Sequence, residues 1–227
     1  MYSPAGNYED YASGRVLFGG RGVPNFPVRL INEMYGRARS LLKDKKRIRV
    51  YDPCCGGAYS LTVLGFFHGP EIEKIWASDV SAEMIGIAEK NLGLLRRAGL
   101  EKRREELRLL YENSGRPSYT DALESLERLR ADLQCEVDAE VFAADCTKPL
   151  PDLAPDLIIT DVPYGNLVDW EGEGALQAML EQLWRISDAG TVLAVSTDKS
   201  QKIGTGKWKR AEKQNIGKRR FEILTKV

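Results

Sequence analysis

The alternation of short apolar runs with segments of helical periodicity constrains this chain more than any other feature. A β-branched run at Arg47–Asp52 is followed by a turn and by an expected helix at Tyr59–His68. A second run at Lys74–Asp79 leads into an expected helix from Ala82 to about Arg97. Repeated strand and helix units of this kind favour an α/β fold, in which helices cover both faces of a mostly parallel sheet.

The remaining apolar runs extend the same pattern towards the C-terminus. Further strands are expected at Val141–Ala144, Leu157–Thr160, Thr191–Ser196 and Phe221–Val227, and a helix around Ala175–Ile186. We therefore predict a doubly wound, Rossmann-like sheet of about seven strands, with right-handed crossovers between its parallel strands.

The length of 227 residues fits one large α/β domain or two small ones, and one domain is the simpler interpretation. We predict a single domain over residues 1–227, with an N-terminal extension at 1–45, a helical insertion at 99–134 and a basic segment at 199–220. The insertion is too long for a plain connection between strands, and Ser114–Pro117 divides it into two expected helices.

The composition excludes several classes of protein. Apolar residues make up 43% and charged residues 29% of the chain, as in ordinary globular domains. The 33 basic and 33 acidic residues cancel, so the overall charge does not indicate nucleic-acid binding. The chain begins without the apolar core of a signal peptide, and no window approaches the roughly 20 apolar residues of a membrane helix. We expect a cytoplasmic monomer without membrane contact.

The spacing of the four cysteines matches neither a zinc site nor a disulfide framework, so no metal is expected.

Four acidic residues follow four successive predicted strands: Asp52, Asp79, Asp145 and Asp161. In an open α/β sheet, ligands bind beyond the carboxyl ends of the strands. Carboxylates gathered there would repel one another unless a ligand with several hydrogen-bond donors lay among them. The acids therefore predict a polar ligand at this edge.

The turn after the first strand, Asp52–Gly57, ends in two glycines that allow a ligand to approach the main chain closely. It resembles the glycine-rich first motif of S-adenosylmethionine-dependent methyltransferases, although a purely structural turn is the alternative. The Gly-x-Gly-x-x-Gly fingerprint is absent, which disfavours NAD. Asp79 would accept the ribose hydroxyls or cap the next helix. Asp145 falls where such methyltransferases hold the adenine amino group, and a solvated loop acid is its alternative.

The segment Leu157–Gly165 resembles the Asp/Asn-Pro-Pro-Tyr motif of amino- and base-methyltransferases, with Val162 in place of the first proline. Asp161 would accept a proton as nitrogen attacks the activated methyl group. Tyr164, which follows Pro163, would offer a flat face to a flipped base. The alternative is a turn after a buried strand.

The expected reaction follows from these motifs. A guanine N1 must lose its proton during methyl transfer, whereas methylation of a ribose oxygen would call for a lysine-centred site, so a base nitrogen is preferred. The expected catalytic residues are Asp161, Pro163 and Tyr164. The expected S-adenosylmethionine-binding residues are Asp52, Cys54, Gly56, Gly57, Tyr59, Asp79, Val80, Asp145, Cys146 and Asp161.

Local charge indicates RNA binding where the overall charge does not. Basic residues gather with Trp208 between Lys199 and Arg220 and are opposed only by Glu212. A second basic cluster at Arg96–Arg104 is interleaved with acids and is better explained as a solvated helix face. The expected RNA contacts are Arg29, Trp170, Lys199, Lys202, Lys207, Trp208, Lys209 and Arg210.

Most of the chain resembles the avilamycin-resistance family of guanine methyltransferases, which act on large-subunit ribosomal RNA. The resemblance implies S-adenosylmethionine-dependent methylation of N1 of one guanine, with the paired inserted helices as a family trait. It is carried by Phe26–Leu30, Asp52–Gly56, Leu61–Gly65, Ala77–Asp79, Lys90–Leu92, Pro117–Tyr119, Asp161–Gly165 and Trp170–Gly172.

The chain also departs from this family. Gly57 and Ala58 stand where the family has Ser-Gly, so we expect the Ala58 methyl group to narrow the access of the cofactor. The chain is shorter near Cys135–Asp138, at Pro149–Pro155 and at the C-terminus. Two other functions stay open: methylation of another amine or amide nitrogen, in a small molecule or a protein, and binding of S-adenosylmethionine and RNA without turnover.

Overall fold

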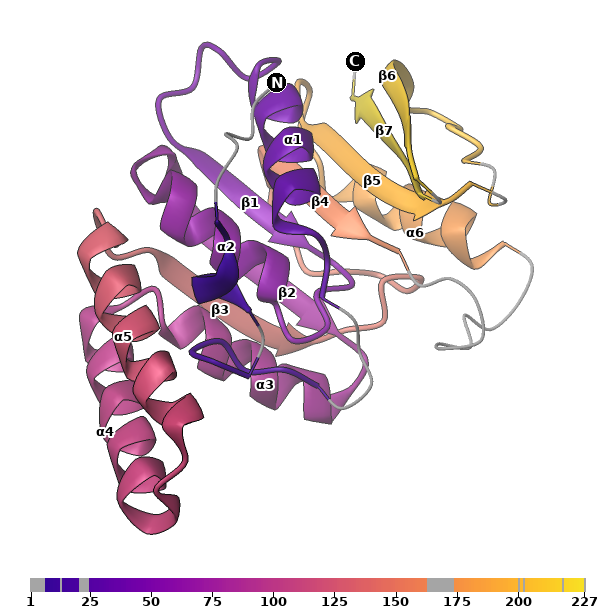
Figure 1. Cartoon of the computed structure of the whole chain (residues 1–227). Coiled ribbons are helices and arrows are strands. Elements are labelled where there is room, and N and C mark those ends of the chain that lie inside the picture. The colour runs from indigo at the N-terminus through magenta and orange to yellow at the C-terminus, as the bar shows by residue number, and fades with distance from the viewer. Residues whose placement is uncertain are drawn as a thin grey trace.

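A sheet of seven strands forms the centre of the computed structural model, which describes residues 7–12, 14–20, 25–162, 174–199, 201, 203–217 and 219–226 (Figure 1). The strand order is β3-β2-β1-β4-β5-β7-β6. The strands are β1 (Ile48–Asp52), β2 (Ile72–Asp79), β3 (Asp138–Ala143), β4 (Leu157–Asp161), β5 (Val192–Asp198), β6 (Lys209–Ile216) and β7 (Arg219–Thr225). The first five are parallel, and β7 runs antiparallel to both β5 and β6. The predicted doubly wound, mostly parallel sheet is confirmed.

Helices cover both faces of this sheet. They are α1 (Val28–Arg39), α2 (Tyr59–His68), α3 (Ala82–Gly93), α4 (Arg97–Ser114), α5 (Pro117–Asp132) and α6 (Ala175–Arg185), with short 3-10 turns at Glu9–Tyr11 and Gly69–Glu71. Successive strand residues point to opposite faces. Val50 accordingly packs in a core with α1, α2 and α3, whereas Tyr51 packs in a second core with α6.

The strand β6 was not predicted, because its sequence lacks the usual apolar signal. Lys209–Ile216 is the outermost strand beside β7, and most of its side chains are exposed to solvent. An edge strand exposed on both faces has no buried side on which apolar residues would recur. Gly217, with a φ of +59°, makes the turn into β7. The last strand therefore begins at Arg219, two residues before its expected start.

The helix predicted after β2, from Ala82 to about Arg97, is shorter than expected. α3 ends at Gly93, and α4 begins at Arg97. A Cβ on Gly99 would lie 1.9 Å from the Gly93 carbonyl oxygen, so the first turn of α4 approaches the end of α3 more closely than other residues allow. The two inserted helices are confirmed, and α4 and α5 form a hairpin that extends away from the sheet (Figure 1).

No helix among the described residues is both long enough and apolar enough to cross a membrane.

Candidate active site at the carboxyl edge of the sheet

The four acids identified in the sequence lie along one edge of the sheet. Asp52, Asp79 and Asp161 are the last residues of β1, β2 and β4, and Asp145 follows β3 by two residues. Since these strands are parallel, their carboxyl ends share an edge. Among the residues that the structure describes, no group of three or more potential ligands is arranged to hold a metal ion. The acids thus lie side by side at the carboxyl edge of the sheet.

The loop after β1 is attached to the ends of β1 and β2. The Cys54 N–H donates to Asp52 Oδ1 at 3.0 Å, and the Cys55 N–H donates to the Ser78 carbonyl oxygen at 2.9 Å. The Gly56 N–H donates to Asp79 Oδ2 at 2.9 Å. The loop is thus held in place by the carboxylates at this edge.

Gly56 and Gly57 meet different requirements. Gly56 has a φ of +51°, a conformation that favours glycine, and open space lies where a Cβ would be. A Cβ on Gly57 would lie 2.8 Å from Ile87 Cγ2, so this glycine allows α3 to pack against the loop. The expected narrowing by Ala58 is wrong, because Ala58 is fully buried in the core on the α1–α3 side and its methyl group does not face solvent.

Burial controls the charge of Asp52. The pKa of Asp52 is raised to about 7, mainly by desolvation, and the Asp79 and Asp161 carboxylates contribute in the same direction. The Thr160 hydroxyl and the Cys54 N–H act in the opposite direction. The site therefore holds an acid near its titration point at neutral pH, which a cationic ligand would ionise.

Asp145 has the opposite environment. Its Oδ1 accepts hydrogen bonds from the Thr147 hydroxyl at 2.6 Å and from the Thr147 N–H at 2.9 Å. Together with Lys148, 3.0 Å from Oδ2, these contacts lower the pKa of Asp145 to about 2. Asp145 is therefore a fixed anion beside the ends of β2 and β3. Thr147 was not among the expected site residues, although a threonine two residues after an aspartate is a common turn signal.

Other expected cofactor residues lie around the same edge. Val80 follows Asp79 and is 72% exposed, an unusual exposure for an apolar side chain. Cys54 Sγ lies 3.5 Å from Cys146 Sγ, so the loops after β1 and β3 touch. Tyr59 binds the N-terminal segment instead, because its hydroxyl donates to the Tyr11 carbonyl oxygen at 2.9 Å. The site thus offers anions and one apolar face, a combination that fits a nucleoside.

Asp161 lies among polar groups without hydrogen-bond partners. Its Oδ1 and the hydroxyls of Thr160, Ser196 and Thr197 are buried and have no partner among the described residues. Its Oδ2 lies 3.7 Å from Nη2 of Arg219. Buried polar atoms without partners cost free energy, so their concentration at the ends of β4 and β5 indicates a place where a polar ligand binds. The expected site residues Pro163, Tyr164, Trp170 and Lys202 lie outside the described residues.

The expected RNA contacts do not gather in one place. Trp208 is only 3% exposed and donates its indole N–H to the Leu180 carbonyl oxygen at 3.0 Å, so the expectation that it contacts RNA is wrong. Lys209 pairs with Thr225 at the amino end of the sheet, remote from Asp161. Arg210 at that end is ion-paired with Glu222.

Two expected RNA contacts lie near the acidic edge. Lys199 follows the last residue of β5 and is exposed. Arg29 is exposed in the first turn of α1, close in sequence to Phe26, which contacts Arg219. Lys207 is exposed but lies over the Trp184 ring, with Nζ 4.6 Å from its centroid.

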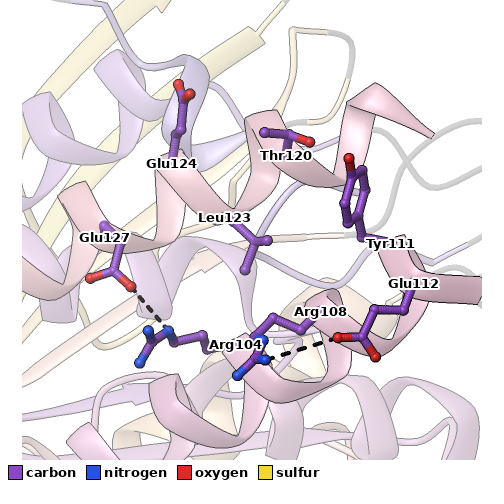
Figure 2. Close-up of a pocket in the computed structure, with 8 residues that line it drawn as sticks. All are labelled: Arg104, Arg108, Tyr111, Glu112, Thr120, Leu123, Glu124 and Glu127. Atoms are coloured by element: carbon purple, nitrogen blue, oxygen red, sulfur yellow. Dashed lines mark ion pairs between the residues drawn. The ribbon is translucent and has the colours of Figure 1, made fainter. Parts of the chain in front are cut away.

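A groove of about 390 Å³ lies on the α4–α5 hairpin, away from the acidic edge. Figure 2 shows that charged side chains from both helices line it. Arg104 Nε lies 3.3 Å from Glu127 Oε1, and Arg108 Nη2 lies 3.9 Å from Glu112 Oε1. These two arginines are therefore paired with acids of the hairpin.

Comparisons with known proteins identify relatives of this chain. The profile of the family described as rRNA methyltransferase AviRa matches residues 2–219. The 23S rRNA (guanine(2535)-N(1))-methyltransferase of Streptomyces viridochromogenes is 40% identical over 222 residues, covering 92% of this chain and 88% of that protein. Two solved structures of the rRNA methyltransferase aviRa from Streptomyces viridochromogenes, at 1.5 and 2.4 Å, give TM-scores of 0.88 and 0.87 with 35% and 36% identity. Each covers 98% of this chain and 94% of its own.

Proposed function

Because this chain belongs to the rRNA methyltransferase AviRa family, we propose that it transfers a methyl group from S-adenosylmethionine to N1 of a guanine in large-subunit ribosomal RNA. The observation that carries the proposal is the row of acids at the carboxyl edge, which ends at Asp161 among buried polar atoms that lack partners. The same edge thus supplies a cofactor cradle and a proton acceptor.

The residues around β1, β2 and β3 suit S-adenosylmethionine. Asp79 would accept the ribose hydroxyls, Val80 would pack against the adenine ring and Asp145 would accept its amino group. The loop after β1, shaped by Gly56, would lie along the methionine part of the cofactor. The cofactor supplies an activated methyl group on a positively charged sulfur, and that charge favours the ionised form of Asp52.

Asp161 would act as the general base. Guanine N1 carries a proton that must leave as the new bond forms, and a carboxylate within hydrogen-bond reach can accept it. Asp161 is at the end of β4, partly buried, with one oxygen that has no hydrogen-bond partner among the described residues. Tyr164, three residues later, would stack on the flipped base.

RNA would approach across the exposed cations beside this edge. Lys199 and Arg29 are exposed near the ends of β5 and β7, where they can contact phosphates that flank the target base. Such contacts position the RNA without reading its sequence, and they weaken as salt concentration rises.

The proposal is tested by transfer of labelled methyl groups to large-subunit rRNA, followed by mass mapping of the product. Asp161→Asn should abolish transfer while calorimetry still detects S-adenosylmethionine binding. Asp44→Asn, which removes an exposed acid from the opposite end of the sheet, is the matched control and should keep full activity. Label that appears only on protein or on small molecules would contradict the proposal.

A further inference from the structure

Arg219 lies against Asp161 because the last strand runs against its neighbour in the sheet. β7 begins at Arg219, whose register partner is Asp198, the last residue of β5. Arg219 Cζ also lies 4.7 Å from the centroid of the Phe26 ring, which precedes α1. The side chains of Arg219 and Asp161 are 19% and 27% exposed. The guanidinium thus contacts both Phe26 and Asp161 and is partly exposed at the carboxyl edge of the sheet.

The contact between Arg219 and Asp161 leaves one carboxylate oxygen of Asp161 available to a ligand. Their closest separation of 3.7 Å exceeds the length of a charge-assisted hydrogen bond, about 2.7–2.9 Å. Asp161 Oδ1 is buried without a hydrogen-bond partner among the described residues. A buried acceptor in this state costs free energy, so the pair is arranged for a ligand that donates to Asp161.

The pair presents a donor beside an acceptor, which is the complement of one edge of guanine. Guanine places the O6 acceptor next to the N1–H donor, whereas adenine places an amino donor next to an N1 acceptor. We propose that Arg219 reads the target base by donating to O6 of guanine while Asp161 accepts the N1–H. The inference rests on the proposed function and makes Arg219 a catalytic residue that also determines base specificity.

The same contact assists the transfer step. Asp161 takes the proton from N1, and the electron pair left on N1 forms the bond to the methyl carbon, whose former bonding pair stays with the sulfur. While this bond forms, negative charge is shared between N1 and O6, and Arg219 stabilises the part on O6. Asp161 ends protonated, and one positive charge has been neutralised at sulfur, so atoms and charges balance.

The groups around Asp161 determine its pKa and thereby its ability to accept a proton. Burial raises the pKa of Asp161, whereas the nearby Ser196 hydroxyl and the Arg219 guanidinium lower it. Asp52 is the acid on the other side, and its own pKa is raised by Asp161. Removal of the Arg219 charge should therefore shift the acid limb of the kcat profile to higher pH, whereas removal of a cation remote from Asp161 should not.

The test compares Arg219→Met and Arg219→Lys with Lys43→Met, which removes one exposed positive charge at the opposite end of the sheet. The substrates are an rRNA fragment containing the guanine mapped for the wild-type enzyme, and the same fragment with 6-thioguanine, a poorer acceptor, at that position. Arg219→Met should lower kcat on guanine about 100-fold, Arg219→Lys by less, and Lys43→Met not at all. S-adenosylmethionine affinity should stay within about twofold of wild type.

The 6-thioguanine substrate isolates the contact with O6. Wild type should lose activity on this substrate, whereas Arg219→Met should lose little more, because the contact is already absent. Equal losses in the two proteins, or a kcat of Arg219→Met close to wild type, would overturn the inference. If Arg219→Met fails to bind S-adenosylmethionine, Arg219→Lys decides: unchanged kcat overturns the inference, and reduced kcat with retained cofactor affinity supports it. A wild-type protein that leaves rRNA guanines unmethylated overturns the proposed function as well.

Discussion

Asn91 binds the main chain of Phe18 through both ends of its side-chain amide. The Phe18 N–H donates to Asn91 Oδ1 at 2.8 Å, and Asn91 Nδ2 donates to the Phe18 carbonyl oxygen at 2.9 Å. The same Nδ2 donates to the Gly57 carbonyl oxygen at 2.8 Å. Asn91 is fully buried in α3. One side chain thereby joins the N-terminal segment to the loop that we assign to the cofactor.

Replacement of Asn91 should affect stability and cofactor binding together. Asn91→Ala removes three hydrogen bonds and leaves main-chain groups of Phe18 and Gly57 without partners, so the free energy of unfolding should fall by about 2–4 kcal/mol. Affinity for S-adenosylmethionine should fall as well, because the loop loses a support. Denaturant unfolding and calorimetry measure the two effects. Asn215→Ala, at an exposed position on β6, should change neither.

Arg103 of α4 holds the same N-terminal segment from the inserted hairpin. Its Nε and Nη2 donate to the carbonyl oxygens of Val16 and Arg15 at 3.0 and 3.1 Å, and its Cζ lies 4.2 Å from the Phe18 ring centroid. Arg103→Met keeps much of the packing but removes these donors, so limited proteolysis should cut within residues 7–20 faster than in wild type. An unchanged cleavage rate would show that the Arg103 donors do not hold the segment.

Asp52 should make stability depend on pH. Its pKa is about 7 in the folded protein and near 3.8 when exposed, so the folded state binds the proton more tightly. Its stabilising contribution is complete below about pH 4 and is lost as pH rises through 7, by up to about 4 kcal/mol. Asp52→Asn should therefore flatten the decline in unfolding free energy between about pH 5 and pH 8. If the unfolding free energy of Asp52→Asn declines as steeply as that of wild type, Asp52 is not the group that titrates in this range.

Cofactor binding should depend on the same proton. A positively charged sulfonium favours ionised Asp52, so the Kd for S-adenosylmethionine should fall as pH rises from about 6 to 8. Calorimetry in buffers of different ionisation enthalpy should detect proton release near pH 6. In Asp52→Asn both effects should disappear. A wild-type Kd that stays constant over this range would place the cationic sulfur away from Asp52.

The position of each lysine should decide its effect on RNA binding. Lys199 lies at the carboxyl edge and Lys209 at the amino end of β6, although both belong to the same basic segment. Lys199→Gln should weaken RNA binding and reduce the slope of log K against log salt by roughly 0.7–0.9, whereas Lys209→Gln should change neither. Equal effects would mean that the RNA extends along β6.

The sequence predicts the central sheet because each inner strand is an apolar run. Leu157–Asp161 is buried along most of its length, and its acid comes directly after the apolar residues, so the edge of the site could be placed as well. Arg219 could not be placed, because its position beside Asp161 depends on the direction of β7 and on pairing with β5. The prediction that Trp208 contacts RNA failed for another reason. An aromatic residue among lysines has the same local sequence pattern whether it stacks on a base or packs under α6.

The position of β7 separates Arg219 along the chain from the acids assigned to the cofactor. The acids assigned to the cofactor are complete by Asp145, whereas the guanidinium assigned to the guanine comes from the last nine residues. During synthesis, the cradle for the methyl donor is therefore made well before the group that reads the base. Loss of β7 would remove Arg219 together with the buried Phe221, Ile223 and Leu224, so recognition of the base and stability of the sheet depend on the same strand.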